Sequence, residues 1–187
     1  MRKPAAHVGP PTDRLWWTSF DSLVGRLHAL ASEAGLYRVR FRCSDENALA
    51  RFTTETTLPI ERNEAGLAEL QEDLLALLAG TIERVRMKFD LGNMRRFQKR
   101  VLEETHKIKR GQVLTYADIA TRVGLPGAAQ AVGQALGQNP LPIVIPCHRV
   151  IAAQGNLGGF TGGLAAKVDL LTLEGVELPQ NQPRLGF

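Results

Sequence analysis

The sequence predicts two domains, an α/β domain over residues 1–92 and a mainly α-helical domain over residues 93–187. Short segments in which apolar and polar residues alternate, the pattern of half-buried strands, lie before residue 92. After it, apolar residues recur at every third or fourth position, which is the period of a helix. The turn-forming sequence Asp90-Leu91-Gly92 separates the two patterns. With 187 residues, 44% of them hydrophobic, the chain has ample material for a core.

The N-terminal half begins with residues 1–13, which show no periodicity and are expected to form a loose tail. Ordered structure is expected from Leu15 onward, and residues 27–32 alternate loosely. Residues 36–42 alternate cleanly, with apolar residues on one face and three arginines on the other, which predicts a half-exposed hairpin strand. A solvated strand face explains the arginines more simply than a nucleic-acid surface does.

Residues 64–79 predict an amphipathic helix, because leucines recur at intervals of three and four while acidic residues take the other face. Gly80 should end this helix. Residues 83–89 alternate again and predict a further strand before the turn at residue 92.

Beyond the turn, Asn93 can cap a helix over about residues 94–109 that is apolar on one side and basic on the other, with Gly111 closing it. The sequence Thr115-Tyr116-Ala117-Asp118 fits the capping pattern [ST]-x-x-[DE] and predicts a short helix after it. A Gly/Pro turn and a second helix over about residues 128–137 should follow. Two short helices joined in this way are typical of a helix-turn-helix.

Six of the ten residues over 128–137, in the second of these helices, are alanine or glycine. Such a slim helix could lie very close to a nucleic-acid backbone. Close packing of one helix on another explains the same pattern, and the pattern does not decide between the two.

The segment Pro140–Val150 carries the most distinctive chemistry. Three apolar residues between prolines, Ile143-Val144-Ile145, predict a buried extended segment that presents Cys147 and His148 side by side. A thiol held in a fixed place suits a nucleophile, because a fixed geometry of attack lowers the entropic part of the barrier. An inert buried cysteine is the alternative.

A glycine-rich loop over residues 154–163 follows. It lacks the Gly-Lys-Ser/Thr of a phosphate-binding P-loop and does not match G-x-G-x-x-G, so we expect a wall where backbone approaches a ligand closely. Residues 164–173 predict a last helix, which Glu174-Gly175 should end.

Charge and composition narrow the function classes. Residues 1–92 hold 12 Lys/Arg against 13 Asp/Glu, whereas residues 93–187 hold 11 against 6, so the helical half has a balance of +5 and favours a polyanionic partner. No apolar run approaches the roughly 18 residues of a membrane span, and no apolar stretch follows the N-terminus as in a secretory signal. The cysteines Cys43 and Cys147 lack zinc-site spacing, so we expect free thiols, no metal and a cytoplasmic location, with Cys43 structural.

The sequence P-C-H-R-V, preceded by N-P-x-P-I-x-I and followed by G-G-L-x-x-K and L-L-x-x-E-G, resembles the O6-alkylguanine–DNA alkyltransferases, also called methylated-DNA–protein-cysteine methyltransferases. The likeness runs from about Gly111 to Gly175. It implies a ribonuclease-H-like N-terminal domain and a C-terminal DNA-binding, alkyl-accepting domain with a winged helix-turn-helix. It also implies a cofactor-free monomer that binds double-stranded DNA in the minor groove and flips out an alkylated guanine. The O6-alkyl group then passes irreversibly to a protein cysteine.

The resemblance also assigns residues. It implies that Cys147 is the alkyl acceptor, that His148 is the base acting through a bound water, that Glu174 orients His148, and that Asn139 braces the active-site turn. It implies that Tyr116 meets the phosphate at the flipped nucleotide and can donate to the base, within a guanine pocket formed by Val150, Gly158, Phe160 and Thr161. It places Ala129, Gln130 and Arg149 among the DNA contacts.

One position departs from the family pattern. The family has an arginine in A-A-R-A-V-G that enters the duplex, whereas this chain has Gln130, which is long but uncharged. Three alternatives to alkyl transfer follow from the sequence: a non-catalytic relative that binds and flags the lesion, a plain helix-turn-helix transcription factor, and a cysteine hydrolase. The first would lack the acceptor cysteine, the second leaves the Cys147–Glu174 constellation unexplained, and the third needs an oxyanion hole.

Overall fold

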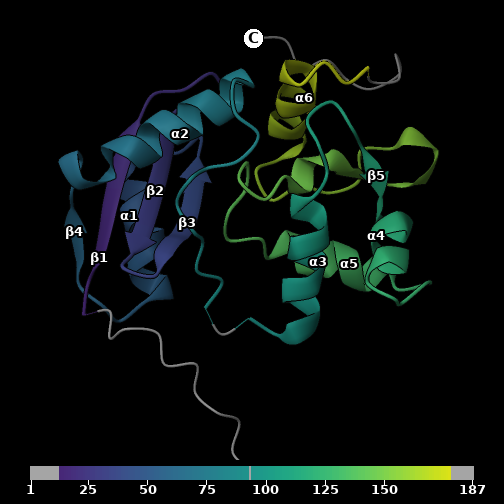
Figure 1. The fold of residues 1–187 in the computed structure, drawn as a ribbon, viewed down its shortest axis with the longest axis horizontal. Coiled ribbons are helices and arrows are strands. Elements are labelled where there is room, and N and C mark those ends of the chain that lie inside the picture. The colour runs from purple at the N-terminus through teal and green to yellow at the C-terminus, as the bar shows by residue number, and fades with distance from the viewer. Residues whose placement is uncertain (1–12, 93, 178–187) are drawn as a thin grey trace, which may run out of the picture.

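The computed structural model describes residues 13–92 and 94–177, and Figure 1 shows their arrangement. A sheet flanked by helices forms one side of the molecule, and a group of helices and short loops forms the other. The loose tail expected over residues 1–13 lies outside the described residues except for its last one. Within the described ranges, no helix combines the length and the apolar character that a membrane span requires.

The sheet has four strands in the order β3-β2-β1-β4. The first three, β1 (Leu15–Phe20), β2 (Leu27–Ser32) and β3 (Gly35–Phe41), pair antiparallel, and β4 (Ile60–Arg62) pairs parallel with β1. The order expected from Leu15 onward begins with β1, the loosely alternating residues 27–32 form β2, and the strand predicted over residues 36–42 is confirmed as β3.

Two helices cover the two faces of the sheet, with α2 (Ala68–Ala79) on the near face in Figure 1 and α1 (Asp45–Glu55) behind it. Side chains alternate accordingly along β2: Ala29 and Ala31 pack in the cluster that contains the α2 leucines, and Leu30 packs with Phe52 of α1. The expected helix over 64–79 is confirmed as a 3₁₀ turn at Ala65–Leu67 followed by α2, and Gly80 caps it in the left-handed conformation, with φ of 78°.

Helix α1 was not predicted from the sequence. Its signals are local: the Ser44 side chain caps the helix by accepting the backbone N–H of Asn47, and two acidic residues occupy the first turn. Only Ala48 and Phe52 are buried, so the helix has too few apolar positions to show a periodic pattern.

The strand expected over residues 83–89 is wrong. The segment runs along the core without joining the sheet, apart from one bridge between Phe89 and Leu36. The buried carboxylate of Asp73 accepts both the backbone N–H of Arg86, at 2.6 Å, and its guanidinium, at 2.9 Å. The alternating apolar side chains of this segment pack against the core. The Asp73 carboxylate accepts the Arg86 N–H, which would bond a neighbouring strand if the segment joined the sheet.

The C-terminal part contains α3 (Arg96–His106), α4 (Tyr116–Arg122), α5 (Ala129–Gly137) and α6 (Leu164–Leu173), with a two-stranded parallel pair, β5 (Leu114–Thr115) and β6 (Val150–Ile151). These helices confirm the expected ones. The capping box also forms as expected: the Thr115 side chain accepts the N–H of Asp118, and the Asp118 carboxylate accepts the N–H of Thr115.

The bounds of α3 differ from expectation. The helix begins at Arg96, where the Gln98 side chain accepts the Arg95 N–H, and ends at His106, five residues before Gly111. Asn93, the expected cap, lies outside the described residues.

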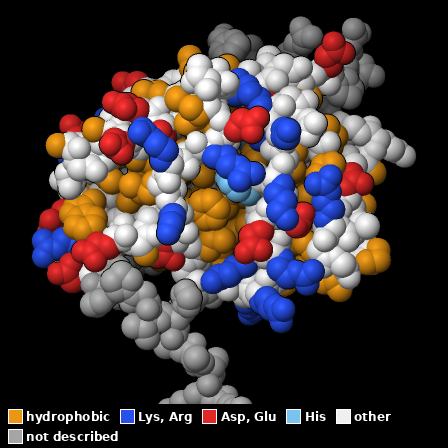
Figure 2. Space-filling view, viewed as in Figure 1, with side chains coloured by type: hydrophobic (Ala, Val, Ile, Leu, Met, Phe, Trp, Pro, Cys, Tyr) orange, Lys and Arg blue, Asp and Glu red, His pale blue; other side chains and the backbone are white. Residues whose placement is uncertain are grey.

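One apolar cluster runs from the sheet into the helical part and includes Val39 of β3, Val101 of α3 and Ile145. The edge strand β3 also contacts the helical part through its backbone, because the Val39 N–H donates to the Pro140 carbonyl at 2.9 Å. Figure 2 shows Lys and Arg side chains gathered on the helical side of the molecule, where the sequence places its positive balance.

Candidate active site

The turn before Cys147 is built by one side chain. Asn139, just after α5, accepts the Leu141 N–H at 3.0 Å and donates to the Ile145 carbonyl at 2.8 Å, so its amide spans the turn. The Ile145 N–H donates to the Leu141 carbonyl, and Ile143 takes a positive φ of 76°. The expected burial of residues 143–145 is confirmed, but the expected extended conformation is wrong. The prolines prevent a helix here, and the Asn139 amide supplies the partners that close a turn instead.

Cys147 begins a 3₁₀ turn, Cys147–Arg149, directly after this Asn139-braced turn. Its Sγ accepts a hydrogen bond from the Asn139 amide at 3.0 Å, and the residue is 6% exposed. Burial raises the pKa of the Cys147 thiol above its ordinary value, although the Asn139 hydrogen bond and the charge of Lys167 act in the opposite direction. The sulfur is therefore held in place as a thiol at neutral pH and needs a base to become a thiolate.

His148 is the candidate base. Its ring is buried, and its Nε2 lies 2.9 Å from Oε1 of Glu174 at the end of α6. A carboxylate partner fixes the proton on Nε2, which leaves Nδ1 as the acceptor. Nδ1 is buried and has no hydrogen-bond partner within the described residues, so it is the ring nitrogen that can receive a proton. Burial lowers the pKa of the His148 imidazole, and Glu174 opposes this shift.

Glu174 is held by a second partner, Arg149. Its Nε donates to Oε2 at 2.8 Å, its Nη2 donates to Oε1 at 2.7 Å, and its Nη1 donates to the Ile108 carbonyl at 2.5 Å. Burial alone would raise the pKa of the Glu174 carboxyl, but the hydrogen bonds from His148 and Arg149 outweigh it and hold the pKa at about 2. Glu174 is therefore a carboxylate at every pH near neutrality.

The place of Arg149 differs from that of a DNA contact. Its guanidinium is buried, and every one of its nitrogens donates to Glu174 or to the Ile108 carbonyl. In this structure Arg149 supports the carboxylate behind His148 instead of presenting its charge on the surface.

Lys167 is a functional candidate to which the sequence analysis gave no role, although the G-G-L-x-x-K motif ends on it. The side chain is fully buried, and its Nζ donates to the carbonyls of Val150 at 2.6 Å and Leu157 at 2.5 Å. Burial lowers its pKa to about 8, while the nearby Cys147 acts to raise it. The signal was the one lysine of a mainly apolar helix, 164–173, whose only other charged residue is Asp169. Lys167 fastens the glycine-rich loop to β6 and places a positive charge near the sulfur.

Cys147 lines a pocket of about 760 Å³. The pocket brings together Cys147 and five of the other expected site residues, namely Tyr116, Ala129, Gln130, Phe160 and Thr161. Its lining includes neither Gly158 nor Val150. Val150 is fully buried behind the site and gives its carbonyl to Lys167.

The glycine-rich loop forms one wall of this pocket, as expected. A Cβ at Gly158, whose φ is +67°, would lie 2.9 Å from the hydroxyl of Tyr116, so only glycine lets the loop come this close. The Tyr116 hydroxyl donates to the Gly159 carbonyl at 3.3 Å, and the Thr161 hydroxyl donates to the Gly137 carbonyl at 3.0 Å. Burial raises the pKa of Tyr116, so its hydroxyl stays protonated and able to donate.

The geometry supports one kind of chemistry. A thiol at the pocket wall, a buried imidazole with a free acceptor nitrogen and a fixed carboxylate behind it can generate a thiolate that attacks a group bound in the pocket. The small side chains of α5 and the exposed Gln130 lie at the same pocket. A group that binds in the pocket would therefore enter it alongside α5.

The sequence is similar to those of known proteins. Residues 96–176 match the family model described as 6-O-methylguanine DNA methyltransferase, DNA binding domain. The methylated-DNA–protein-cysteine methyltransferase of Mycolicibacterium paratuberculosis is 45% identical over 60% of this chain and 67% of its own length. The protein of the same name from Methanosarcina acetivorans is 34% identical over 86% of this chain and 99% of its own length.

The fold has solved counterparts. The crystal structure of Mycobacterium tuberculosis OGT in complex with DNA superposes with a TM-score of 0.71 and 33% identity. The superposition covers 85% of this chain and 92% of that one. The similarity therefore extends through the N-terminal sheet as well as the helical part that contains the pocket.

Proposed function

This chain belongs to the family of methylated-DNA–protein-cysteine methyltransferases, and from that premise we propose that Cys147 is the cysteine that accepts the alkyl group. The chain is a DNA repair methyltransferase, and the substrate that we propose is O6-alkylguanine, chiefly O6-methylguanine, in double-stranded DNA. The observation that carries the assignment is the placement of Cys147 Sγ at the pocket, held by Asn139 and backed by the His148–Glu174 pair.

The proposed reaction uses each of these groups once. A water molecule relays the Cys147 proton to Nδ1 of His148, and Glu174 stabilises the imidazolium that forms. The sulfur then forms a bond to the alkyl carbon while the bond from that carbon to O6 breaks, and the electron pair passes to the purine. The Tyr116 hydroxyl or a backbone N–H near Thr161 donates to the purine as this charge develops. The thioether on Cys147 is stable, so each molecule acts once.

We also propose the following DNA-binding mode. The α4–α5 pair serves as the helix-turn-helix of a winged domain beginning at residue 93, and residues 1–92 form a ribonuclease-H-like domain. The small side chains of α5 let it enter the narrow minor groove, where larger ones would clash. Flipping out a base costs a few kcal/mol, less for a damaged pair, and phosphate contacts offset that cost. In this binding mode the protein acts on DNA as a monomer.

Arg149 and Lys167 act in this proposal as positioning residues. Arg149 fixes the carboxylate that orients His148, and Lys167 fixes the loop that forms the pocket wall. Both side chains are buried, so their effect on the reaction passes through the groups that they hold.

A stoichiometry measurement tests the proposed function. A duplex with one O6-methylguanine is mixed with a limiting amount of protein, and the restored guanine is counted. We expect restoration to stop when one guanine has been restored for each protein molecule. Multiple turnovers would favour a hydrolase, and tight lesion binding without restoration would favour a lesion-binding protein.

Replacing Gln130 with arginine should strengthen binding to damaged duplex. Gln130 is exposed on α5 at the pocket, so an added guanidinium can contact phosphate or the orphaned base. We expect about one additional counterion to be released, which steepens the dependence of log K on log salt by roughly one. Fluorescence anisotropy at several salt concentrations measures this slope. Gln130→Met is the matched neutral control, and weaker binding of Gln130→Arg would place α5 away from the DNA.

The rate of transfer should resist mild acid. His148 must be neutral to accept the thiol proton, and its lowered pKa keeps it neutral below the ordinary value of about 6.5. The single-turnover rate should therefore fall only when the pH drops below that value. Rapid-quench measurements across pH 5 to 8, with DNA binding saturated at each pH, give the midpoint. A midpoint above the ordinary histidine value would contradict the assignment of His148 as the base.

A further inference from the structure

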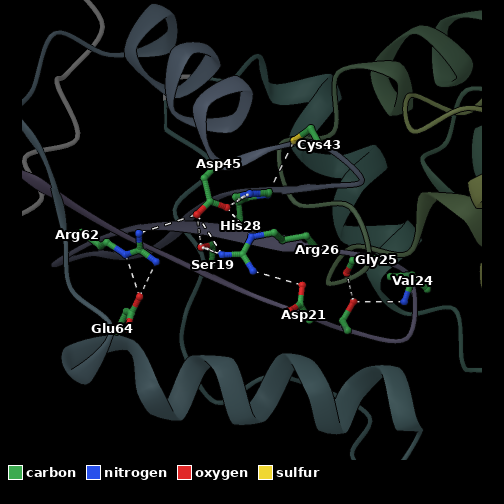
Figure 3. A network of polar contacts seen from close by, with 11 residues as sticks. Ser19, Asp21, Val24, Gly25, Arg26, His28, Cys43, Asp45, Arg62 and Glu64 are labelled. Carbon is green, nitrogen blue, oxygen red and sulfur yellow. Dashed lines mark hydrogen bonds and ion pairs between the residues drawn. The ribbon is translucent and has the colours of Figure 1, made fainter.

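The second cysteine, Cys43, belongs to a polar network that alkyl transfer does not use (Figure 3). Cys43 lies between β3 and α1, and its Sγ lies 3.9 Å from Nδ1 of His28 on β2. The other ring nitrogen of His28, Nε2, lies 3.0 Å from Oδ1 of Asp45. The ring is fully buried, and Figure 3 shows it lying between the sulfur and the carboxylate. A thiol, an imidazole and a carboxylate in series are the groups that activate nucleophilic cysteines.

The carboxylate end of this series is fixed. Arg26 donates to Asp45 from Nε at 2.6 Å and from Nη2 at 3.1 Å, and the Ser19 hydroxyl donates to the same carboxylate at 3.0 Å. The hydrogen bond from Arg26, followed by that from His28, lowers the pKa of Asp45, so it remains a carboxylate. A fixed negative charge at Nε2 stabilises the imidazolium that forms when His28 takes the proton of Cys43.

The sulfur end faces a cavity. Cys43 lines a pocket of about 510 Å³ whose charged lining residues are four arginines, Arg38, Arg40, Arg42 and Arg51, and one carboxylate, that of Glu55. Glu55 pairs with Arg38 and Arg40, and Arg42 pairs with Asp169. Arg51 forms no ion pair with any residue that the structure describes, so the lining keeps an excess of positive charge. Such a cavity favours a small molecule that carries carboxylates.

We propose that Cys43 is a second reactive thiol, which forms a mixed disulfide with anionic low-molecular-weight disulfides of the oxidised-glutathione type. The proton of Cys43 passes to Nδ1 of His28, and the thiolate attacks one sulfur of the disulfide. A bond forms between the two sulfurs, and the original S–S bond breaks. The departing thiolate leaves with that electron pair and takes the proton from His28, so Cys43 is oxidised and the small disulfide is reduced by the same two electrons.

Burial acts against this reaction, because it raises the pKa of the Cys43 thiol while Arg51 and Arg40 oppose the shift. Burial alone would therefore make Cys43 less reactive in the folded chain than in the unfolded chain. Cys43 should be more reactive in the folded chain only if His28 accepts its proton and the arginines stabilise its thiolate.

Two disulfides of opposite charge, oxidised glutathione and cystamine, test the proposal without altering the site. The full chain carrying Cys147→Ser leaves Cys43 as its one cysteine, and intact-protein mass gives the rate of adduct formation. We expect Cys43 in the folded chain to react with oxidised glutathione about tenfold faster than Cys43 in the chain unfolded in urea. We also expect the ratio of its rates with oxidised glutathione and with cystamine to be about tenfold larger in the folded chain than in the unfolded chain. Equal or slower reaction in the folded chain, or an unchanged preference, would overturn the proposal.

Two variants separate the charge effect from the base. Arg51→Glu, at an exposed position, should reduce the preference for oxidised glutathione by roughly threefold or more. His28→Asn, with its fold checked by circular dichroism, should bring the folded rate to that of the unfolded chain. If His28→Asn does not fold, the comparison of the two disulfides still decides. If Arg51→Glu leaves the preference for oxidised glutathione over cystamine unchanged, the proposal that the arginine-lined pocket attracts the anionic disulfide would be contradicted.

Discussion

Replacing Cys147 with serine should abolish alkyl transfer while DNA binding is retained. A serine hydroxyl is a far weaker nucleophile at neutral pH than a thiolate, so we expect the single-turnover rate to fall by at least about 10³-fold. The oxygen can still accept the Asn139 hydrogen bond, so the turn and the pocket should keep their shape. Restoration of O6-methylguanine in a duplex measures the first effect, and anisotropy with the same duplex measures the second.

The matched control is Cys43→Ser, since Cys43 lines a different pocket from that of Cys147 and is the only other cysteine of the chain. This variant should transfer the alkyl group at the rate of the unaltered protein. Transfer that survives in Cys147→Ser would mean that another residue is the acceptor.

Replacing Glu174 with glutamine should reduce both stability and the rate of transfer. The substitution preserves shape but leaves the buried guanidinium of Arg149 without its counter-charge, and loss of one partner from a buried pair costs about 3–5 kcal/mol. It also removes the carboxylate that fixes the His148 tautomer, which should slow transfer by about 10²–10⁴-fold. Urea unfolding and single-turnover rates, measured where the variant is fully folded, give the two quantities.

The pH dependence of unfolding provides a control for Glu174→Gln. The folded carboxyl has a pKa of about 2, below its ordinary value, so its contribution is complete above the ordinary value of about 4.3. That contribution is lost as the pH falls toward 2. The gap in stability between the two proteins should therefore narrow in acid. A gap that stays constant from pH 6 to pH 3, or no gap at neutral pH, would contradict the role given to the ion pair.

The sequence predicted correctly those elements whose start or end is fixed by residues within a few positions along the chain. The Thr115–Asp118 capping box and the glycine after α2 act within a few residues, and both form as expected. Helix α1 was missed because only two of its side chains are buried, which leaves no periodic pattern. The strand expected over 83–89 failed because the Asp73 carboxylate, distant in sequence, takes the backbone donor of Arg86.

The candidate site was predictable only in part, because some of its geometry also depends on hydrogen bonds between residues that are apart in the sequence. The resemblance indicated Cys147, His148, Glu174 and Asn139, and the structure brings these four side chains together. The turn over 143–145 depends on one hydrogen bond that Asn139 donates and one that it accepts, which an apolar run between prolines does not reveal.

Two basic residues show the same limit. The burial of Arg149 and Lys167 depends on carbonyls and on a carboxylate supplied by other elements. Neither charge could be assigned to the interior from its position in the sequence.

The central claim is that the Cys147 sulfur becomes permanently alkylated by carbon from a guanine in DNA. Intact-protein mass spectrometry after incubation with duplex containing O6-methylguanine, followed by peptide mapping, tests it directly. We predict that the protein gains the mass of one methyl group in place of a hydrogen, located on Cys147, in an amount equal to the guanine restored. An unchanged mass, or a methyl group located on another residue, would contradict the claim.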